Sequence, residues 1–101
     1  PVYNGHSEAV DIEFEKEISP EEVREILKNS FGIKVIDNPD NYEYPTTRDA
    51  SGVNPVFAGR IRKNLAFKNG ITLWCVADNL RIGAALNTVR ICQKVIEMDL
   101  F

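Results

Sequence analysis

The sequence is poor in the residues that usually hold metals. Among 101 residues there are two cysteines and one histidine. Cys75 and Cys92 stand 17 positions apart and form neither a Cys-x-x-Cys pair nor a Cys/His spacing. Because a structural zinc site typically takes four such ligands, we expect no metal centre. The two cysteines are expected to be buried free thiols in a reducing compartment.

Long apolar runs and an excess of positive charge are also missing. No apolar run approaches the roughly 18 residues that a membrane span needs, and no signal-peptide pattern is visible. The formal net charge is −3 and the pI is near 5.1, so nothing favours nucleic acid as a partner. With 44% hydrophobic and 27% charged residues, the chain is expected to form one cytoplasmic domain over 1–101, with neither membrane nor nucleic-acid partners.

The first third of the chain predicts a strand followed by a helix. Apolar residues alternate with acidic ones from Val10 to Phe14, which is typical of a strand with one buried face. The motif "ISPEEV" then predicts a helix start, with Ser19 as N-cap and Glu22 completing a capping box. The apolar stripe of this helix is expected to reach Phe31, and Gly32 is expected to end it in a left-handed conformation.

The middle of the chain predicts a strand at 33–37 and then a long irregular stretch over 38–55. Three prolines interrupt this stretch, and it shows no regular period. Two interpretations remain open: a loop that covers a site or meets a partner, and a solvated excursion.

Two further strands are predicted at 56–67 and 71–77. The Asn-Gly pair between them favours a tight hairpin, because both residues tolerate positive φ. The first of these strands carries a basic cluster, Arg60, Arg62 and Lys63. The cluster is suited to phosphate or carboxylate, to a subunit contact, or to pairing with the acidic face of the first strand. We favour the structural pairing.

The last helix is predicted over 79–99, with Asp78 or Asn79 as its cap. At 100° per residue its apolar side chains fall on two nearly opposite faces. One sheet face can cover only one of them, so the second cover is expected from outside this chain or from a second copy. The element order predicts an α+β fold, with a mostly antiparallel four-stranded sheet and two helices packed on one face.

The opening stretch "PVYNGHSEAV" holds the single histidine, His6, between Gly5 and Ser7 and directly before the first strand. An imidazole titrates close to neutral pH and can act as a general acid or base. A lone histidine before a strand is, however, more often an ordinary surface residue. The residues alone favour that second interpretation.

Three stretches in order, "PVYNGHSEAV", "DASG…VFAGRIRK" and "LWCVADNLRIGAALN", resemble the aspartate-semialdehyde dehydrogenase family. The resemblance implies a glyceraldehyde-3-phosphate-dehydrogenase-like C-terminal domain. It makes 1–101 the C-terminal portion of the substrate-binding and dimerisation domain. It also implies that the chain is a piece of a longer protein and that helix 79–99 packs on a nucleotide-binding domain outside the chain.

The resemblance also implies a reaction. The family reduces L-aspartyl phosphate to aspartate semialdehyde with NADPH through a cysteine thioester, in lysine, threonine, methionine and diaminopimelate biosynthesis. His6 occupies the position of the acid–base histidine, and Asn79 resembles a position near the nicotinamide of NADP. Neither Cys75 nor Cys92 matches the nucleophile motif, which lies outside this chain.

The resemblance leaves Arg60, Arg62 and Lys63 to domain or subunit packing. It further implies a small-molecule substrate and a homodimer or homotetramer, whereas the chain alone is expected to be inactive. Two alternatives stay open. One is a free-standing dimerisation or binding module, and the other is a fragment of N-acetylglutamyl-phosphate reductase.

Overall fold

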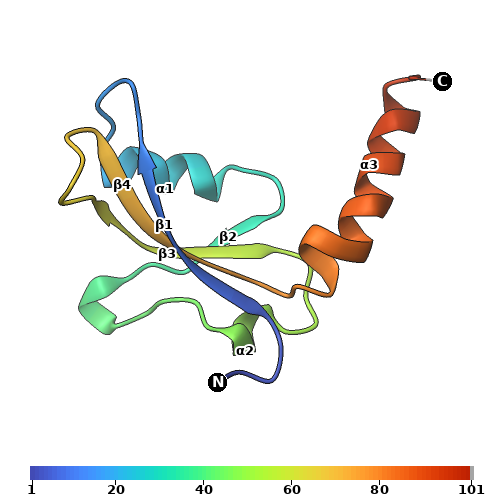
Figure 1. Ribbon diagram of the computed structural model, residues 1–101, viewed down its shortest axis with the longest axis horizontal. Coiled ribbons are helices and arrows are strands. Elements are labelled where there is room, and N and C mark those ends of the chain that lie inside the picture. Colours follow the sequence, from blue (N-terminus) through green and yellow to red (C-terminus); the bar gives the residue numbers. More distant parts are fainter. Residues whose placement is uncertain (101) are drawn as a thin grey trace.

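A computed structural model describes residues 1–100 and shows a four-stranded sheet from which the last helix extends (Figure 1). The strand order is β1-β4-β3-β2; β4 pairs antiparallel with β1 and β3, and β2 pairs parallel with β3. This confirms the α+β, mostly antiparallel fold. The elements are β1 His6–Glu13, α1 Pro20–Lys28, β2 Ile33–Val35, the short turn η1 Pro39–Asn41, α2 Thr47–Ala50, β3 Val56–Lys63, β4 Gly70–Ala77, the turn η2 Arg81–Ala85 and α3 Leu86–Glu97.

Helix α1 covers one face of the sheet. Its buried Val23 packs with Ile61, Ile71 and Leu73 from the two central strands. The alternating residues of β1 add to this cluster, because Val10 lies opposite Leu73 and shares its face. The main apolar core therefore lies between α1 and the sheet, as the strand alternation predicted.

The sequence predicted the start of α1 correctly but not its end. At the start, the Ser19 hydroxyl accepts from the Glu22 amide at 3.2 Å, and the Glu22 carboxylate accepts from the Ser19 amide at 2.8 Å. This confirms the capping box. The hydrogen bonds that the Glu22 carboxylate accepts from the Ser19 amide and from the Ser19 hydroxyl lower the pKa of Glu22.

At the other end α1 stops at Lys28, earlier than predicted. The side chains of Asn29 and Ser30 donate to the carbonyls of Glu25 and Ile26, and so satisfy the last turn. Gly32 does have a positive φ of 79°, but it lies in the turn into β2. Phe31 is 91% exposed, so its assignment to the buried stripe was wrong.

The stretch 38–55 covers the opposite face of the sheet. Its helix α2 places Ala50, fully buried, against Phe57 and Val76. The indole nitrogen of Trp74 donates to the Pro45 carbonyl at 3.1 Å. This stretch therefore supplies Pro45 and Ala50 to a second core layer, which contradicts a wholly solvated excursion although most of its other side chains are exposed. The interpretation as a loop that covers a site or meets a partner stays a prediction.

The hairpin between β3 and β4 is wider than predicted. β3 ends at Lys63 rather than at residue 67, and Asn64–Asn69 form the connection in place of a two-residue turn. The Asn64 carboxamide oxygen accepts from the amides of Ala66 and Phe67 at 2.7 and 3.0 Å. A side chain that binds backbone amides locally competes with strand pairing, which explains the early end of β3.

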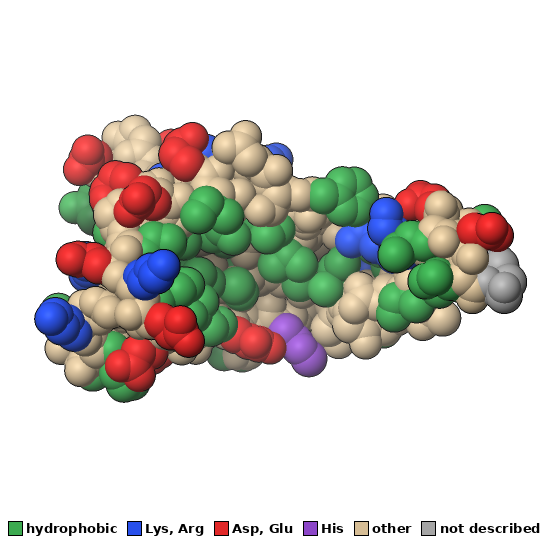
Figure 2. Space-filling model, turned by 90° about the horizontal axis from the view of Figure 1, so that it is seen from above, with side chains coloured by type: hydrophobic (Ala, Val, Ile, Leu, Met, Phe, Trp, Pro, Cys, Tyr) green, Lys and Arg blue, Asp and Glu red, His purple; other side chains and the backbone are tan. Residues whose placement is uncertain are grey.

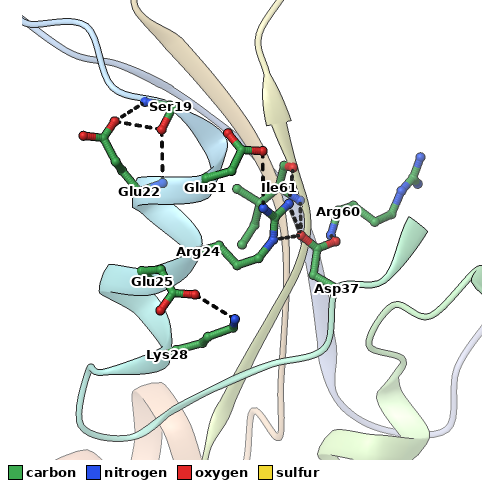
Figure 3. A network of polar contacts seen from close by, with 9 residues as sticks. All are labelled: Ser19, Glu21, Glu22, Arg24, Glu25, Lys28, Asp37, Arg60 and Ile61. Carbon is green, nitrogen blue, oxygen red and sulfur yellow. Dashed lines mark hydrogen bonds and ion pairs between the residues drawn. The ribbon is translucent and has the colours of Figure 1, made fainter. Parts of the chain in front are cut away.

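A buried carboxylate fixes an irregularity in β3 (Figure 3). The register shifts between Gly59 and Arg62, and Arg60 takes a positive φ of 52°. Asp37, whose side chain is 1% exposed, accepts from the Arg60 amide at 2.7 Å and the Ile61 amide at 3.3 Å. Its ion pair with Arg24 of α1 is 2.8 Å long. These four residues, Arg24, Asp37, Arg60 and Ile61, are called the Asp37 bridge below.

Helix α3 begins at Leu86, seven residues later than predicted. The amides of Arg81 and Ile82 both bond the Asp78 carbonyl, and Gly83 then takes a φ of 81°. This turn separates α3 from the end of β4 and directs it away from the sheet (Figure 1).

The expectation of two helices on one sheet face therefore holds for α1 alone. α3 has no buried residue, and it meets the body where the Arg90 guanidinium lies 5.3 Å from the Phe31 ring. Val89 and Ile91 are 53% and 65% exposed. Residues 1–100 thus bury neither apolar face of α3, so the prediction that the sheet covers one of them was wrong, whereas the second face is uncovered as predicted.

Candidate functional site

His6 is the first residue of β1 and lies opposite Ala77, the last residue of β4. Its side chain is exposed and makes no hydrogen bond or ion pair to residues 1–100. It lines a pocket of about 300 Å³ together with Cys75, Asn79 and Gly83. Figure 2 shows apolar side chains gathered in a hollow between the sheet and α3, with the histidine at its edge. The imidazole is thus free to meet a group that enters this pocket.

The turn before His6 is held by Asn79. The Asn79 carboxamide oxygen accepts from the Gly5 amide at 2.9 Å. Within residues 1–100 this is the single hydrogen bond of the Asn79 side chain, so its amide nitrogen remains available on the pocket side. The structure therefore brings His6 and Asn79, 73 positions apart in the sequence, to one pocket.

Asp78 is 3% exposed and acts beside Asn79 as an acceptor for backbone amides. Its carboxylate accepts from Gly52 at 2.8 Å and from Leu80 at 2.9 Å. These two hydrogen bonds lower the pKa of Asp78, with a smaller effect from the Arg81 charge. Asp78 therefore caps the turn after β4, and neither it nor Asn79 caps α3 as the sequence suggested.

The two cysteines do not supply a nucleophile. Cys75 is half-buried in the pocket, and burial, with the Glu8 carboxylate opposite it, raises the pKa of its thiol. A nucleophilic cysteine needs the opposite shift, toward the thiolate. Cys92 is exposed on α3, so the prediction that both thiols are buried was wrong for this residue. Within residues 1–100 neither cysteine forms a disulfide.

The basic cluster does not pair with the acidic face of β1. Strand β4 lies between β1 and β3, so the two faces are not cross-strand neighbours. Lys63 instead pairs at 3.1 Å with Glu17, beyond the end of β1, and Arg62 donates to the Arg60 carbonyl at 2.7 Å. The favoured pairing with the acidic face of β1 was therefore wrong, and among the three basic residues only Lys63 has an acidic partner within residues 1–100.

Residues 1–100 offer neither a metal cluster nor a candidate membrane span. No group of three or more His, Cys, Asp or Glu side chains is placed to hold a metal ion. In the same part of the chain, none of the helices has the length and apolar character for crossing a membrane.

Sequence reasoning missed the parts of this site that depend on contacts between distant segments. The Asn-Gly pair before His6 and the Asp-Asn pair after β4 were both visible. Such pairs favour turns in general, and the sequence pattern does not predict that the two turns are joined by a hydrogen bond.

The family model described as "Semialdehyde dehydrogenase, dimerisation domain" matches residues 1–82. Among curated proteins, aspartate-semialdehyde dehydrogenase of Aquifex aeolicus is 54% identical over 100 residues. That alignment covers 99% of this chain and 29% of the relative. The enzyme of the same name from Campylobacter jejuni is 47% identical, over 97% of this chain and 29% of the relative. The chain thus spans 29% of the length of these relatives.

A solved structure gives the same result. Aspartate semialdehyde dehydrogenase II of Vibrio cholerae, complexed with ASA, superposes with a TM-score of 0.87 at 39% identity. The match covers 95% of this chain and 28% of that one. The fold described above is therefore found within a known enzyme structure.

Proposed function

The chain belongs to the semialdehyde dehydrogenase family, as part of its dimerisation domain, and on this premise we propose that it is a portion of an aspartate-semialdehyde dehydrogenase. The proposed reaction converts L-aspartyl phosphate, NADPH and a proton into aspartate semialdehyde, NADP and phosphate. A cysteine outside this chain attacks the acyl phosphate, phosphate leaves, and the resulting thioester is reduced. The names of the relatives support this substrate over N-acetylglutamyl phosphate.

His6 is the acid–base group of this proposal, and its free position at the pocket carries it. The imidazole is exposed at a pocket edge and committed to no partner in residues 1–100. An uncommitted imidazole can accept the thiol proton of the incoming cysteine and return a proton near neutral pH. Next to a cysteine, the imidazolium also favours the nucleophilic thiolate.

The pocket fits only one end of a dinucleotide. Its volume of about 300 Å³ suits a small group, and Asn79 offers a free amide donor there. When bound, NADPH would supply the hydride, and the Asn79 amide nitrogen is the donor that would hold the reactive end of the cofactor in this pocket. The rest of the cofactor, and the phosphate-binding groups, would lie with the parts of the protein outside this chain.

The uncovered faces of α3 supply the second part of the proposal. Their exposure in residues 1–100 supports packing against a nucleotide-binding domain of the full-length protein. The description of the matched family as a dimerisation domain supports a homodimer or homotetramer. We assign the full-length protein to the cytoplasm.

The proposal is tested by His6→Gln in the full-length protein. General acid–base catalysis is typically worth about a hundred- to ten-thousandfold, so kcat is expected to fall by that order. Circular dichroism and the melting temperature should not change, because His6 is exposed and bonds nothing in residues 1–100. The matched control is Ser7→Ala, the exposed neighbour on the other face of β1. Turnover by His6→Gln equal to that of Ser7→Ala would overturn the assignment.

A further inference from the structure

Three segments that are distant in the sequence close a ring directly beneath His6. Three hydrogen bonds join them: from the Asn4 amide nitrogen to the Ser51 hydroxyl at 2.8 Å, from the Gly52 backbone to Asp78 at 2.8 Å, and from the Gly5 backbone to Asn79 at 2.9 Å. Each segment contributes two consecutive residues, so the covalent chain completes the ring. We call this ring the loop clamp; its members are Asn4, Gly5, Ser51, Gly52, Asp78 and Asn79.

The clamp leaves the turn before His6 little freedom. Gly5 has a φ of 90°, a region that residues with a Cβ rarely enter. A Cβ on Gly5 would lie 3.2 Å from both the Ala77 carbonyl oxygen and the Thr47 methyl group. Gly5 is buried although its neighbour His6 is exposed. The backbone that carries the imidazole is therefore fixed from three sides.

Asn79 is the member of the clamp that acts most directly on this backbone. Its oxygen bonds the amide of Gly5, the residue immediately before His6. Asp78 holds the other side of the ring, because its buried carboxylate binds the amide of Gly52. Loss of the Asn79 oxygen would release the turn and leave a part-buried amide without its acceptor.

We infer that Asn79 is a positioning residue for His6, which it orients through the Gly5 amide, with Asp78 and Ser51 completing the support. This inference rests on the proposed acid–base role of His6. It assigns the Asn79 oxygen a task separate from any contact of its amide nitrogen with cofactor. Misplacing a reacting group by about 1 Å can slow an enzyme about a hundredfold, so the clamp has a measurable consequence for turnover.

A double-mutant cycle in the full-length protein tests the inference. The proteins compared are wild type, His6→Gln, Asn79→Ala and the double variant, each measured for kcat and for KM of both substrates. If Asn79 acts through His6, Asn79→Ala should lower kcat by about ten- to a hundredfold in the wild type. In the His6→Gln background the same change should lower kcat less than about threefold, because coupled residues are not additive.

The matched control is Asn64→Ala. The Asn64 oxygen also binds backbone amides, but it lies in the hairpin at the other end of β4, about 20 Å away by strand length. Because the Asn64 amide nitrogen also donates to Asp11 and Thr72, Asn64→Ala should lose at least as much stability as Asn79→Ala and still keep wild-type turnover per folded molecule. Asn79→Asp is the second variant, since it keeps the oxygen acceptor and removes the amide donor. It should retain more kcat than Asn79→Ala, while any cofactor contact of the donor would show as a higher KM for NADPH.

The outcomes separate the two proposals. If His6→Gln leaves turnover intact, the acid–base role fails, and the positioning role fails with it. If His6→Gln slows turnover but Asn79→Ala slows both backgrounds equally, only the positioning inference is overturned. The inference is also overturned if Asn79→Asp raises the KM for NADPH and loses as much kcat as Asn79→Ala, because the lost group would then be the donor.

Discussion

An aspartate holds the backbone at two places in the sheet, the bulge of β3 and the turn before β1, but the two aspartates serve different purposes. At the bulge of β3, Asp37 binds two backbone amides and an arginine from α1 (Figure 3). At the start of β1, Asp78 also binds two backbone amides, but its nearest cationic group is the Arg81 guanidinium at 3.9 Å. The Asp37 bridge ties a helix to the sheet, whereas the loop clamp ties three turns beneath one exposed side chain. The first should support stability, and the second geometry.

Gly59→Ala, at the bulge of β3, should produce the largest loss of stability. A Cβ there would overlap the Ile36 carbonyl oxygen and lie 2.5 Å from the Pro45 ring. Because both are fixed parts of the second layer, the sheet must shift, and we expect a loss of about 4 kcal/mol or more in the free energy of unfolding. Urea denaturation of the full-length protein measures it. The control is Gly83→Ala, which meets no atom within 4 Å and should lose only about 1–2 kcal/mol from its positive φ.

Asp37→Ala should produce the next largest loss, about 3 kcal/mol, because it removes the buried ion-pair partner of Arg24 and leaves two backbone amides without acceptors. Turnover per folded molecule should stay at the wild-type level. Glu21→Ala is the control: it removes the exposed 3.7 Å partner of the same arginine and should change stability by less than about 1 kcal/mol. A large loss of turnover in folded Asp37→Ala would contradict the assignment of stability to the Asp37 bridge and of site geometry to the loop clamp.

The bulge shows why sequence reasoning reaches local features and stops at distant contacts. The capping box of Ser19 and Glu22 was predictable because its residues lie three positions apart and follow a local rule. Asp37 was placed at the end of a strand, yet its partners on α1 and β3 lie 13 to 24 positions away. No periodicity encodes which carboxylate will meet which amide, so the bulge itself was not predicted.

The same limit applies to the candidate site. The motif around His6 was sufficient to single out the histidine as a candidate, but the turn at Asn4 and Gly5 was not predicted. The start of α3 was predicted seven residues too early, because the apolar period continues through Ile82 although the backbone leaves helical geometry at Ile82, Gly83 and Ala84. Tertiary hydrogen bonds overrode a helical pattern, and they placed Asn79 beside Gly5 instead of on a helix.

Gly5→Ala should show, at the turn before His6, that the loop clamp matters more for the position of His6 than for stability. The positive φ predicts a loss of about 1–2 kcal/mol, and the 3.2 Å contacts with Ala77 and Thr47 add to it, but the total should stay below the loss at Gly59. Turnover should nevertheless fall about a hundredfold, because the strained turn carries His6. Gly32→Ala is the control for the positive φ: it has a φ of 79° and only an ordinary contact with Arg90, so it should lose about 1–2 kcal/mol and keep full turnover. Equal turnover in the two variants would show that the loop clamp does not hold the site.

The smallest of the predicted effects is the loss of stability in acid, when the Asp78 carboxylate of the loop clamp is protonated. Its pKa is lowered in the folded chain from an ordinary value of 3.8 by the amides of Gly52 and Leu80. The unfolded chain therefore binds this proton first as pH falls. The stabilisation is fully present above about pH 5 and is lost below pH 3.8, as the pH falls through the folded-state pKa.

Comparison with Asp78→Asn isolates this effect, because the lowered pKa values of Glu22 and Asp49 act equally in both proteins. The amide cannot titrate and cannot offer two acceptor oxygens. The wild type should melt at the higher temperature at pH 6, and the difference should shrink as the pH falls to 3. A difference that stays constant over this range would mean that the Asp78 charge does not stabilise the clamp. Turnover would then depend on the uncharged link from Asn79 to Gly5 alone.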